Sequence, residues 1–596
     1  AVTTGTNNTL IGALAGDALT VGTRNVAVGK SALSADTQGS RSVALGRSAL
    51  QTQNFTSATD AYNVAVGDLA GFSVTTGVQN TLIGGLAGDA ITTGYYNTAL
   101  GKDALGTNTL SSLNVAIGHS ALKTMSAGNA ETHNVAVGAS AGLSVTTGTF
   151  NTLIGGLAGD AITTGIRNTA VGHQSFSTNT TGGLNTALGR SALFSNTTAS
   201  NNTAVGYEAL YANTTGANNA SVGKGSMFAN TTGGANAALG VDALLSNTTG
   251  DANTAVGYGA LDSNTSANNN TAVGSYSLGA NTTGTQNVAV GSSSLVTNTT
   301  GGQNTAVGLN SLLSNTTGSY NTASGIQALN SNTTASNNVA MGYQALYANT
   351  TGSHNVAIGN SSGSSITTGT QNVIVAANGG AITTGSNFTC LGYASMGGAI
   401  STGDKNTAVG YATLYEVTSG GNNTALGGDA GRAASPSGSI TTGSNRIVLG
   451  NNSVTNAYIK VAWTVTSDAR DKTDFTPLDL GLDFVKELKP ITYKWDMRSN
   501  YGDSEAEDYD LAAQTPDGTH KEDWLDIGFK AQEVEALEIA AGYNKDNKTN
   551  LISSYTEDGN SMGLKYEKFV PILVKAIQEQ QTLIESLTDR ITALEG

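Results

Sequence analysis

The sequence predicts a mainly β protein, in which a long parallel β-solenoid is followed by a small α+β domain that ends in a coiled-coil helix. Three observations support this prediction: a short repeat that recurs along most of the chain, an abrupt change of composition near residue 467, and a heptad pattern at the C-terminal end. The predicted boundaries are 1–450 for the solenoid shaft, 451–466 for a junction, 467–565 for the domain and 566–596 for the helix.

The repeat reads approximately Asn-Thr-Ala-Val-Gly-x-x-Ala-Leu-x-x-Asn-Thr-Thr-Gly-x-x, and its first glycine defines 26 anchor positions from Gly12 to Gly450. Each of the 14 steps from Gly138 to Ala376 is 17 residues long. Just before the anchor, Thr or a β-branched residue and then Val, Ile or Leu flank a near-constant Ala, which is the period-2 pattern of a short strand. Glycines at fixed corners between such strands predict one solenoid coil per repeat.

One coil cannot fold alone. Ordering its residues costs on the order of 25 kcal/mol, whereas its roughly three apolar side chains contribute about 1.5–3 kcal/mol each. Stacked coils share hydrogen bonds, and an oligomer can bury a further face. The Asn that opens each repeat, as at Asn25, Asn168 and Asn304, is therefore predicted to form a ladder of side-chain amides. A register kept over 26 repeats argues against the disorder that this composition otherwise favours.

Composition and charge exclude several classes of function. Residues 1–466 hold 15 acidic and 13 basic residues, and residues 467–596 hold 27 acidic and 14 basic residues, with no basic stripe for nucleic acid. No apolar run approaches the 18 residues of a membrane span. The single Cys390 excludes an intrachain disulfide framework. Fifteen acids over 26 coils are too few for calcium-binding repeats, and we expect no metal and no cofactor.

Two side-chain patterns within the repeats are candidates for a binding or catalytic role. One subtype carries isolated carboxylates at Asp17, Asp89 and Asp160, which occur singly and so do not form the carboxylate pair of a glycoside hydrolase. Aromatic residues also recur five positions after the anchor, at Phe194, Tyr211, Phe228, Tyr347 and Tyr415. They are either a hydrophobic corner or a stacking platform for surface sugars.

The Asn-x-Ala-Val/Ile-Gly phrase of residues 1–450 resembles the head repeats of trimeric autotransporter adhesins and the repeats of some phage tail fibres. In the adhesin heads this phrase builds a left-handed parallel β-roll, and three such rolls pack into a trimer. The resemblance therefore implies a trimeric rod. The 17-residue period is longer than the adhesin coil.

A second resemblance covers residues 467–596. It rests on five segments in order: Thr466-Ser-Asp-Ala-Arg-Asp-Lys472, Phe484-Val-Lys-Glu-Leu-Lys-Pro490, Tyr493-Lys-Trp495, Ile527-Gly-Phe-Lys-Ala-Gln-Glu-Val534 and Tyr566-Glu-Lys-Phe-Val-Pro571-Ile-Leu-Val-Lys-Ala-Ile577-Gln-Glu-Gln580. Together they resemble the self-cleaving intramolecular chaperone domain of endosialidases and of phage tail spikes and fibres. The resemblance implies Ser467 as nucleophile, Lys472 as base and cleavage between Thr466 and Ser467, with Asp468 and Arg470 in support.

The residues alone leave the geometry of this dyad open. A lysine can serve as base to a serine if desolvation or neighbouring cations favour its neutral form. Residues five apart on a strand point to opposite faces. Ser467 and Lys472 must therefore meet across a turn, or Lys472 must reach the Ser467 of a neighbouring chain, which would couple cleavage to assembly.

The C-terminal segment predicts a helix with a heptad seam. Apolar residues alternate at spacings of four and three, as a coiled coil requires. The seam residues are Val570, Leu573, Ile577, Gln580, Ile584, Leu587, Ile591 and Leu594. β-Branched residues at one core position with Leu at the other favour a parallel dimer by side-chain rules, whereas the family resemblance implies a trimer, which we adopt.

The resulting expectation is a homotrimeric viral tail fibre that binds a host-surface receptor, expected to be a glycan, and whose C-terminal chaperone drives trimerisation before releasing itself by serine autoproteolysis. It would fold in the host cytoplasm, act on the virion tail and attach to the virion through a region upstream of Ala1, without nucleic acid and without membrane insertion. The alternatives are a cellular trimeric surface adhesin and, on the repeated Asn-Thr-Thr-Gly, an ice-binding solenoid.

Overall fold

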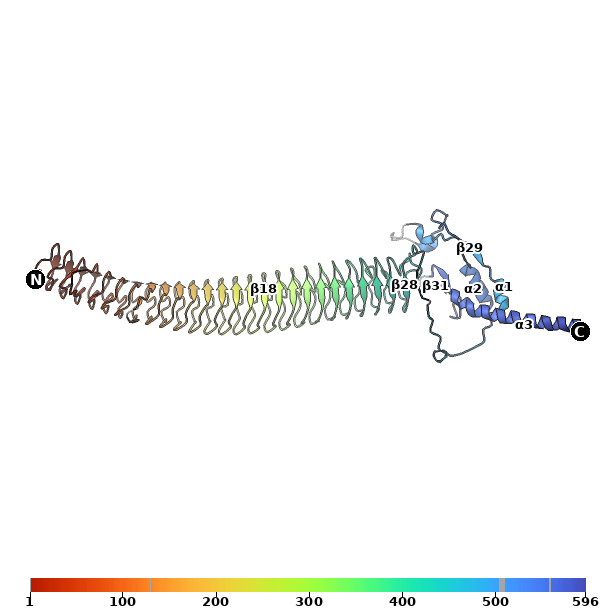
Figure 1. The fold of residues 1–596 in the computed structure, drawn as a ribbon, viewed down its shortest axis with the longest axis horizontal. Helices are drawn as coiled ribbons and strands as arrows, with labels where there is room; N and C mark the ends of the chain where they lie inside the picture. The colour runs from red at the N-terminus through yellow and green to blue at the C-terminus, as the bar shows by residue number, and fades with distance from the viewer. Residues whose placement is uncertain (1, 129, 462, 503–509, 557–558) are drawn as a thin grey trace. The chain divides into compact units, whose positions relative to one another are not determined.

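The computed structural model describes residues 2–128, 130–461, 463–502, 510–556 and 559–596 (Figure 1). The chain divides into two compact units, Ala1–Asn338 and Val339–Gly596. Within these described ranges, no helix is long and apolar enough to cross a membrane.

The first unit is a stack of coils, and each coil contributes one short strand to a parallel sheet. Successive strands pair with equivalent residues opposite one another, as Thr254 opposite Thr271. The strands are β1 (Thr9–Ile11), β2 (Val26–Val28), β4 (Val43–Leu45), β6 (Val64–Val66), β7 (Thr81–Ile83), β8 (Thr98–Leu100), β9 (Val115–Ile117), β10 (Val135–Val137), β11 (Thr152–Ile154), β12 (Thr169–Val171), β13 (Thr186–Leu188), β14 (Thr203–Val205), β15 (Ala220–Val222), β16 (Ala237–Leu239), β17 (Thr254–Val256), β18 (Thr271–Val273), β19 (Val288–Val290), β20 (Thr305–Val307) and β21 (Thr322–Ser324). A second parallel pair joins β3 (Gly39–Ser40) and β5 (Thr59–Asp60).

The second unit begins with coils of the same kind. Their strands are β22 (Val339–Met341), β23 (Val356–Ile358), β24 (Val373–Val375), β25 (Thr389–Leu391), β26 (Thr407–Val409), β27 (Thr424–Leu426) and β28 (Ile447–Leu449). The coils of the two units supply 26 strands in all. The predicted parallel β-solenoid of about 26 coils with a 17-residue period is confirmed.

The interior of each coil is filled by small and medium side chains. The central Ala of the strand, as at Ala255, is fully buried, and so is the Leu four residues after the anchor, as at Leu261. The anchor glycine brings successive coils together: Gly257 has φ 135°, and a Cβ there would lie 2.5 Å from the carbonyl oxygen of Gly274. A side chain at Gly257 would therefore push these two coils apart.

Two ladders of buried Asn side chains link the coils. In the first, the backbone N–H of Asn270 donates to Asn253 Oδ1 over 3.0 Å, and Asn253 Nδ2 donates to the Ala267 carbonyl over 2.8 Å. This is the predicted amide ladder, which is confirmed. A second ladder comes from the Asn-Thr-Thr triplets, where Asn247 Nδ2 donates to Asn230 Oδ1 over 2.8 Å. Buried amides are stable here because each finds a partner one coil away.

The C-terminal domain is α+β, as predicted. Its elements are η1 (Ala469–Asp471), α1 (Leu482–Glu487), β29 (Ile491–Tyr493), η2 (Arg498–Asn500), η3 (Leu511–Ala513), β30 (Asp526–Gly528), α2 (Ala531–Ala540), β31 (Ser553–Tyr555), β32 (Met562–Leu564), η4 (Tyr566–Lys568) and α3 (Phe569–Glu595). The strands form two antiparallel pairs, β29 with β30 and β31 with β32.

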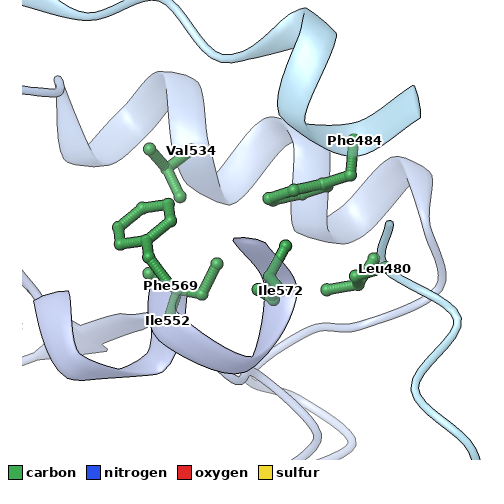
Figure 2. Packing of buried hydrophobic residues seen from close by; sticks show 6 residues of the cluster. All are labelled: Leu480, Phe484, Val534, Ile552, Phe569 and Ile572. Carbon is green, nitrogen blue, oxygen red and sulfur yellow. The ribbon is translucent and has the colours of Figure 1, made fainter. Parts of the chain in front are cut away.

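One apolar cluster holds this domain together. It joins residues from α1, α2, α3 and the chain beside them, and Figure 2 shows their side chains facing one another. The cluster consists of Leu480, Phe484, Val534, Ile552, Phe569 and Ile572. These residues are far apart in the sequence, so the domain depends on long-range contacts that occur only once in the chain.

Two glutamates connect the helices to the rest of the domain. The buried carboxylate of Glu538 in α2 accepts hydrogen bonds from three successive backbone N–H groups, those of residues 551–553, at 2.6–2.9 Å. Glu579 in α3 accepts from the backbone N–H of Leu482, the first residue of α1, over 2.7 Å. This bond, followed by that from Lys575, lowers the pKa of Glu579. Gly481 leaves room for it, since a Cβ there would lie 2.2 Å from Glu579 Oε2.

Candidate functional site

The chain reverses direction directly after the predicted cleavage bond. Asp468 caps the short helix η1, and its Oδ1 accepts from the backbone N–H of Arg470 over 2.9 Å. The Arg470 guanidinium also donates to Asp468 Oδ2 over 2.6 Å. The Arg470 side chain and then its backbone N–H lower the pKa of Asp468. Both predicted supporting residues therefore help to close this turn, because a charge-assisted cap favours the helical start.

The turn brings the two predicted catalytic side chains together. Lys472 Nζ donates to Ser467 Oγ over 2.5 Å within one chain. Of the two arrangements that the sequence left open, the structure has the one in which the residues meet across a turn. Residues 469–471 are helical, so the opposite-face geometry of a strand does not apply to this pair.

The solvent exposure of the Ser467–Lys472 pair bears on its chemistry as much as the distance between the two side chains. Thr466, Ser467 and Lys472 are all exposed. A lysine amine becomes a base when burial disfavours its charged form. The single chain thus brings the predicted nucleophile and the predicted base into contact, and it leaves both exposed to solvent.

The eight predicted seam residues lie along the outside of α3. All eight are exposed, including Ile577 at 64% and Leu594 at 86%. The residues of α3 that contact the domain core are different ones: Phe569, Ile572 and Ala576. One helix therefore presents two apolar stripes, of which the first packs within the chain and the second has no partner among the described residues.

The coils present a similar unpartnered stripe. The residue before each anchor glycine points outward from the sheet, so that Leu239 is 53% exposed and Ile358 is 38% exposed. The strand alternation that the sequence showed thus places Ala inside and the larger Val, Ile or Leu outside. An apolar column that recurs at nearly every coil, broken at Ser324, is more than the scattered exposed residues of an ordinary monomer.

Stacked rings support the hydrophobic-corner interpretation for three of the five aromatic residues that the sequence singled out. The rings of Phe194, Tyr211 and Phe228 stack face to face, with centroids 5.1 Å apart and planes within 7°. Both faces of the Tyr211 ring are therefore covered, by Phe194 on one side and Phe228 on the other. The side chain of Tyr415 lies under the guanidinium of Arg432, at 5.0 Å. The sugar-platform alternative stays a prediction.

Sequence reasoning missed the contacts that position the dyad's domain. Glu538, Glu579 and Gly481 act through backbone N–H groups, which have no sequence signature of their own. A buried acid on α2 and a glycine directly before α1 were the available signals.

Comparison with known families identifies the C-terminal domain. Residues 467–543 match the model of the peptidase family S74, described as chaperone of endosialidase. The chain carries a chaperone-of-endosialidase domain. The match begins at Ser467 and includes Lys472, Asp468 and Arg470. No curated protein and no solved structure matches the chain.

Proposed function

We propose that this protein is a homotrimeric viral tail fibre, in which the solenoid mediates host-surface recognition and the C-terminal domain directs trimerisation before releasing itself. The observation that carries the proposal is the attachment of a chaperone-of-endosialidase domain to a long repetitive solenoid. A chaperone domain in the same chain is useful where the repetitive coils cannot by themselves determine how three chains align with one another.

The two unpartnered apolar stripes support three-fold assembly. Neither the strand column nor the α3 seam contains a charged residue; the seam is exposed in the single chain, and the column is exposed or half-buried. Burying a Val, Leu or Ile side chain contributes about 1.5–3 kcal/mol, so that a column repeated at nearly every coil outweighs the entropy of association. Parallel chains place equivalent residues side by side, as both stripes require.

The repeats explain why a separate nucleus is needed. A coil pairs with its neighbour through the same Thr, Ala and Asn contacts almost everywhere, so three chains shifted by one coil lose little. Weakly specified register favours misassembly. The C-terminal domain has a core of residues that each occur once, and so it can align three chains at their ends before the coils associate.

Self-cleavage follows from the Ser467–Lys472 contact. The neutral amine of Lys472 takes the proton of Ser467 Oγ as this oxygen attacks the carbonyl carbon of Thr466. The C–N bond breaks, the amine of Ser467 receives the proton from Lys472, and an ester links Thr466 to Ser467 Oγ. Water then hydrolyses the ester and leaves a fibre ending at Thr466 and a fragment starting at Ser467.

The test of cleavage is intact mass and denaturing electrophoresis of the purified protein. We expect wild type to divide between Thr466 and Ser467, and both Ser467→Ala and Lys472→Ala to stay full length. Lys460→Ala is the matched control, because this nearby lysine lies outside the turn, and it should cleave like wild type. Wild type that stays uncut as a trimer, or Ser467→Ala that still divides, would refute self-cleavage.

Assembly and recognition are tested separately. Light scattering of the Ser467→Ala protein should give three times the chain mass, and a monomer would refute the trimer. Labelled trimers should bind intact cells of a susceptible bacterium, and periodate oxidation of the cell-surface glycans should abolish binding. Binding that survives periodate would point to a protein receptor instead.

A further inference from the structure

The junction before Ser467 has the pattern of a β-strand but no strand partner. From Ile459 to Thr466 the sequence reads Ile-Lys-Val-Ala-Trp-Thr-Val-Thr, with apolar residues at every odd position. Strict alternation over this length is typical of a strand with one apolar face. The described residues between β28 and η1 nevertheless form no strand, and the chain bends at Lys460 and Val461 (Figure 1).

The apolar face of this segment is open to solvent. Ile459 is 51% exposed, and Val461, Trp463 and Val465 are 73–76% exposed. Among the described residues of 457–466, no backbone or side-chain hydrogen bond is formed. A segment of strand-like alternation whose apolar face is exposed gains stability by packing that face against another apolar surface.

The chemistry of the segment favours another copy of itself as partner. Lys460 is its one charged residue and lies on the opposite face from Val461, so like segments can pair without burying a charge. The exposed column of the coils ends at Leu449, ten residues earlier in the chain, and the exposed seam of α3 begins at Val570. If both stripes hold three chains parallel and level, the three junctions are confined near one another at an effective concentration in the mM range.

We propose that residues 459–466 of three chains associate as parallel, in-register β-strands whose apolar faces meet on the trimer axis. This inference rests on the proposed homotrimer and assigns the junction a role of its own. It places an interchain β-structure directly against the bond to be cleaved.

This pairing supplies what the dyad lacks in a single chain. Thr466 is the last residue of the alternating segment, so strand pairing would hold its carbonyl still beside Ser467 Oγ. Neighbouring strands would also cover the turn, and loss of water favours the neutral form of a lysine. Cleavage would then begin only after the three chains are aligned.

Site-directed crosslinking in the uncut Ser467→Ala protein tests the pairing. Val461→Cys points to the axis, and Lys460→Cys, its neighbour in the chain, points away. Val465→Cys and Thr464→Cys repeat the comparison, in case one variant folds poorly. The native Cys390 does not interfere, because it is buried and burial raises the pKa of its thiol to about 12.

A short bis-maleimide reagent followed by denaturing electrophoresis gives the readout. We expect roughly ten-fold more linked chains for Val461→Cys and Val465→Cys than for their neighbours, because inward thiols of parallel strands lie within reach of one reagent. A trimer that links both faces equally, or neither, would overturn the pairing and leave the trimer standing. A monomeric protein would overturn the proposed function and the pairing with it.

Discussion

In the coils of residues 1–450, the side chains that fill the interior are mainly Ala, Leu and Asn, and Asn residues such as Asn253 bond to their equivalents one coil away. In residues 467–596 the interior is a single cluster in which Phe484 meets Ile572 and Val534 meets Phe569 (Figure 2). Contacts of the first kind repeat every 17 residues and tolerate a shift by one coil. Contacts of the second kind exist in one alignment only.

This difference separates two tasks. Repetition makes a long shaft from little information, since hydrogen bonds between coils reappear at each step. Repeated contacts do not determine which coil of one chain packs beside which coil of another. A non-repetitive domain can determine this alignment, because its contacts form in one arrangement only.

Removal of the C-terminal domain should have the largest effect. A chain that ends at Thr466 keeps every coil but loses the unique contacts, so we expect monomers and aggregates in place of trimers. Size-exclusion chromatography with light scattering measures the outcome. Soluble, uniform trimers from this shortened chain would show that the coils align themselves.

The two apolar stripes of α3 should separate assembly from folding. Ile577→Glu alters an exposed seam residue, so we expect a folded domain that no longer trimerises. Ile572→Glu places a charge in the core and should unfold the domain, at a cost of about 3–5 kcal/mol. Circular dichroism and light scattering distinguish the two. Gln578→Glu, beside the seam, is the control and should do neither; a trimeric Ile577→Glu would exclude the seam.

One change in the amide ladder should destabilise the shaft locally. Asn253→Asp replaces a donor to the Ala267 carbonyl by a buried carboxylate, at a cost on the order of 3 kcal/mol. Asn269→Asp is the matched control, because Asn269 is exposed and lies one coil further on. Hydrogen exchange should show faster opening around residue 253 only. Equal protection in both variants would mean that the ladder contributes little.

Acid should weaken the α1–α3 contact by the smallest amount. The pKa of Glu579 is lowered in the folded chain, so its contribution is present above its ordinary pKa of 4.5 and disappears as the pH falls through the lowered value. Wild type should therefore melt higher than Glu579→Gln at pH 7, and this gap should shrink below about pH 4. A gap that is constant with pH would assign the effect to shape rather than charge.

Sequence periodicity was sufficient for the architecture of the shaft. The 17-residue register predicted the coils, the parallel pairing and the buried ladder through residues such as Asn168, because a spacing that persists over 26 repeats has one simple structural cause. The composition change near residue 467 and the motif around Ser467 likewise predicted the C-terminal domain. Short, local and repeated features are visible in a sequence.

Only the tertiary structure decided which way the side chains point and what meets across the chain. Alternation in Thr254-Ala-Val256 defines two faces of a strand, but the stacking of coils places Ala255 inside. Leu261 adopts φ 53°, a conformation that leucine rarely takes, because its neighbours in the stack hold it there. Ser467 meets Lys472 because Asp468 caps a turn, and Glu579 reaches Leu482 across 97 positions of the chain. Such contacts arise from packing between distant segments, which no local pattern records.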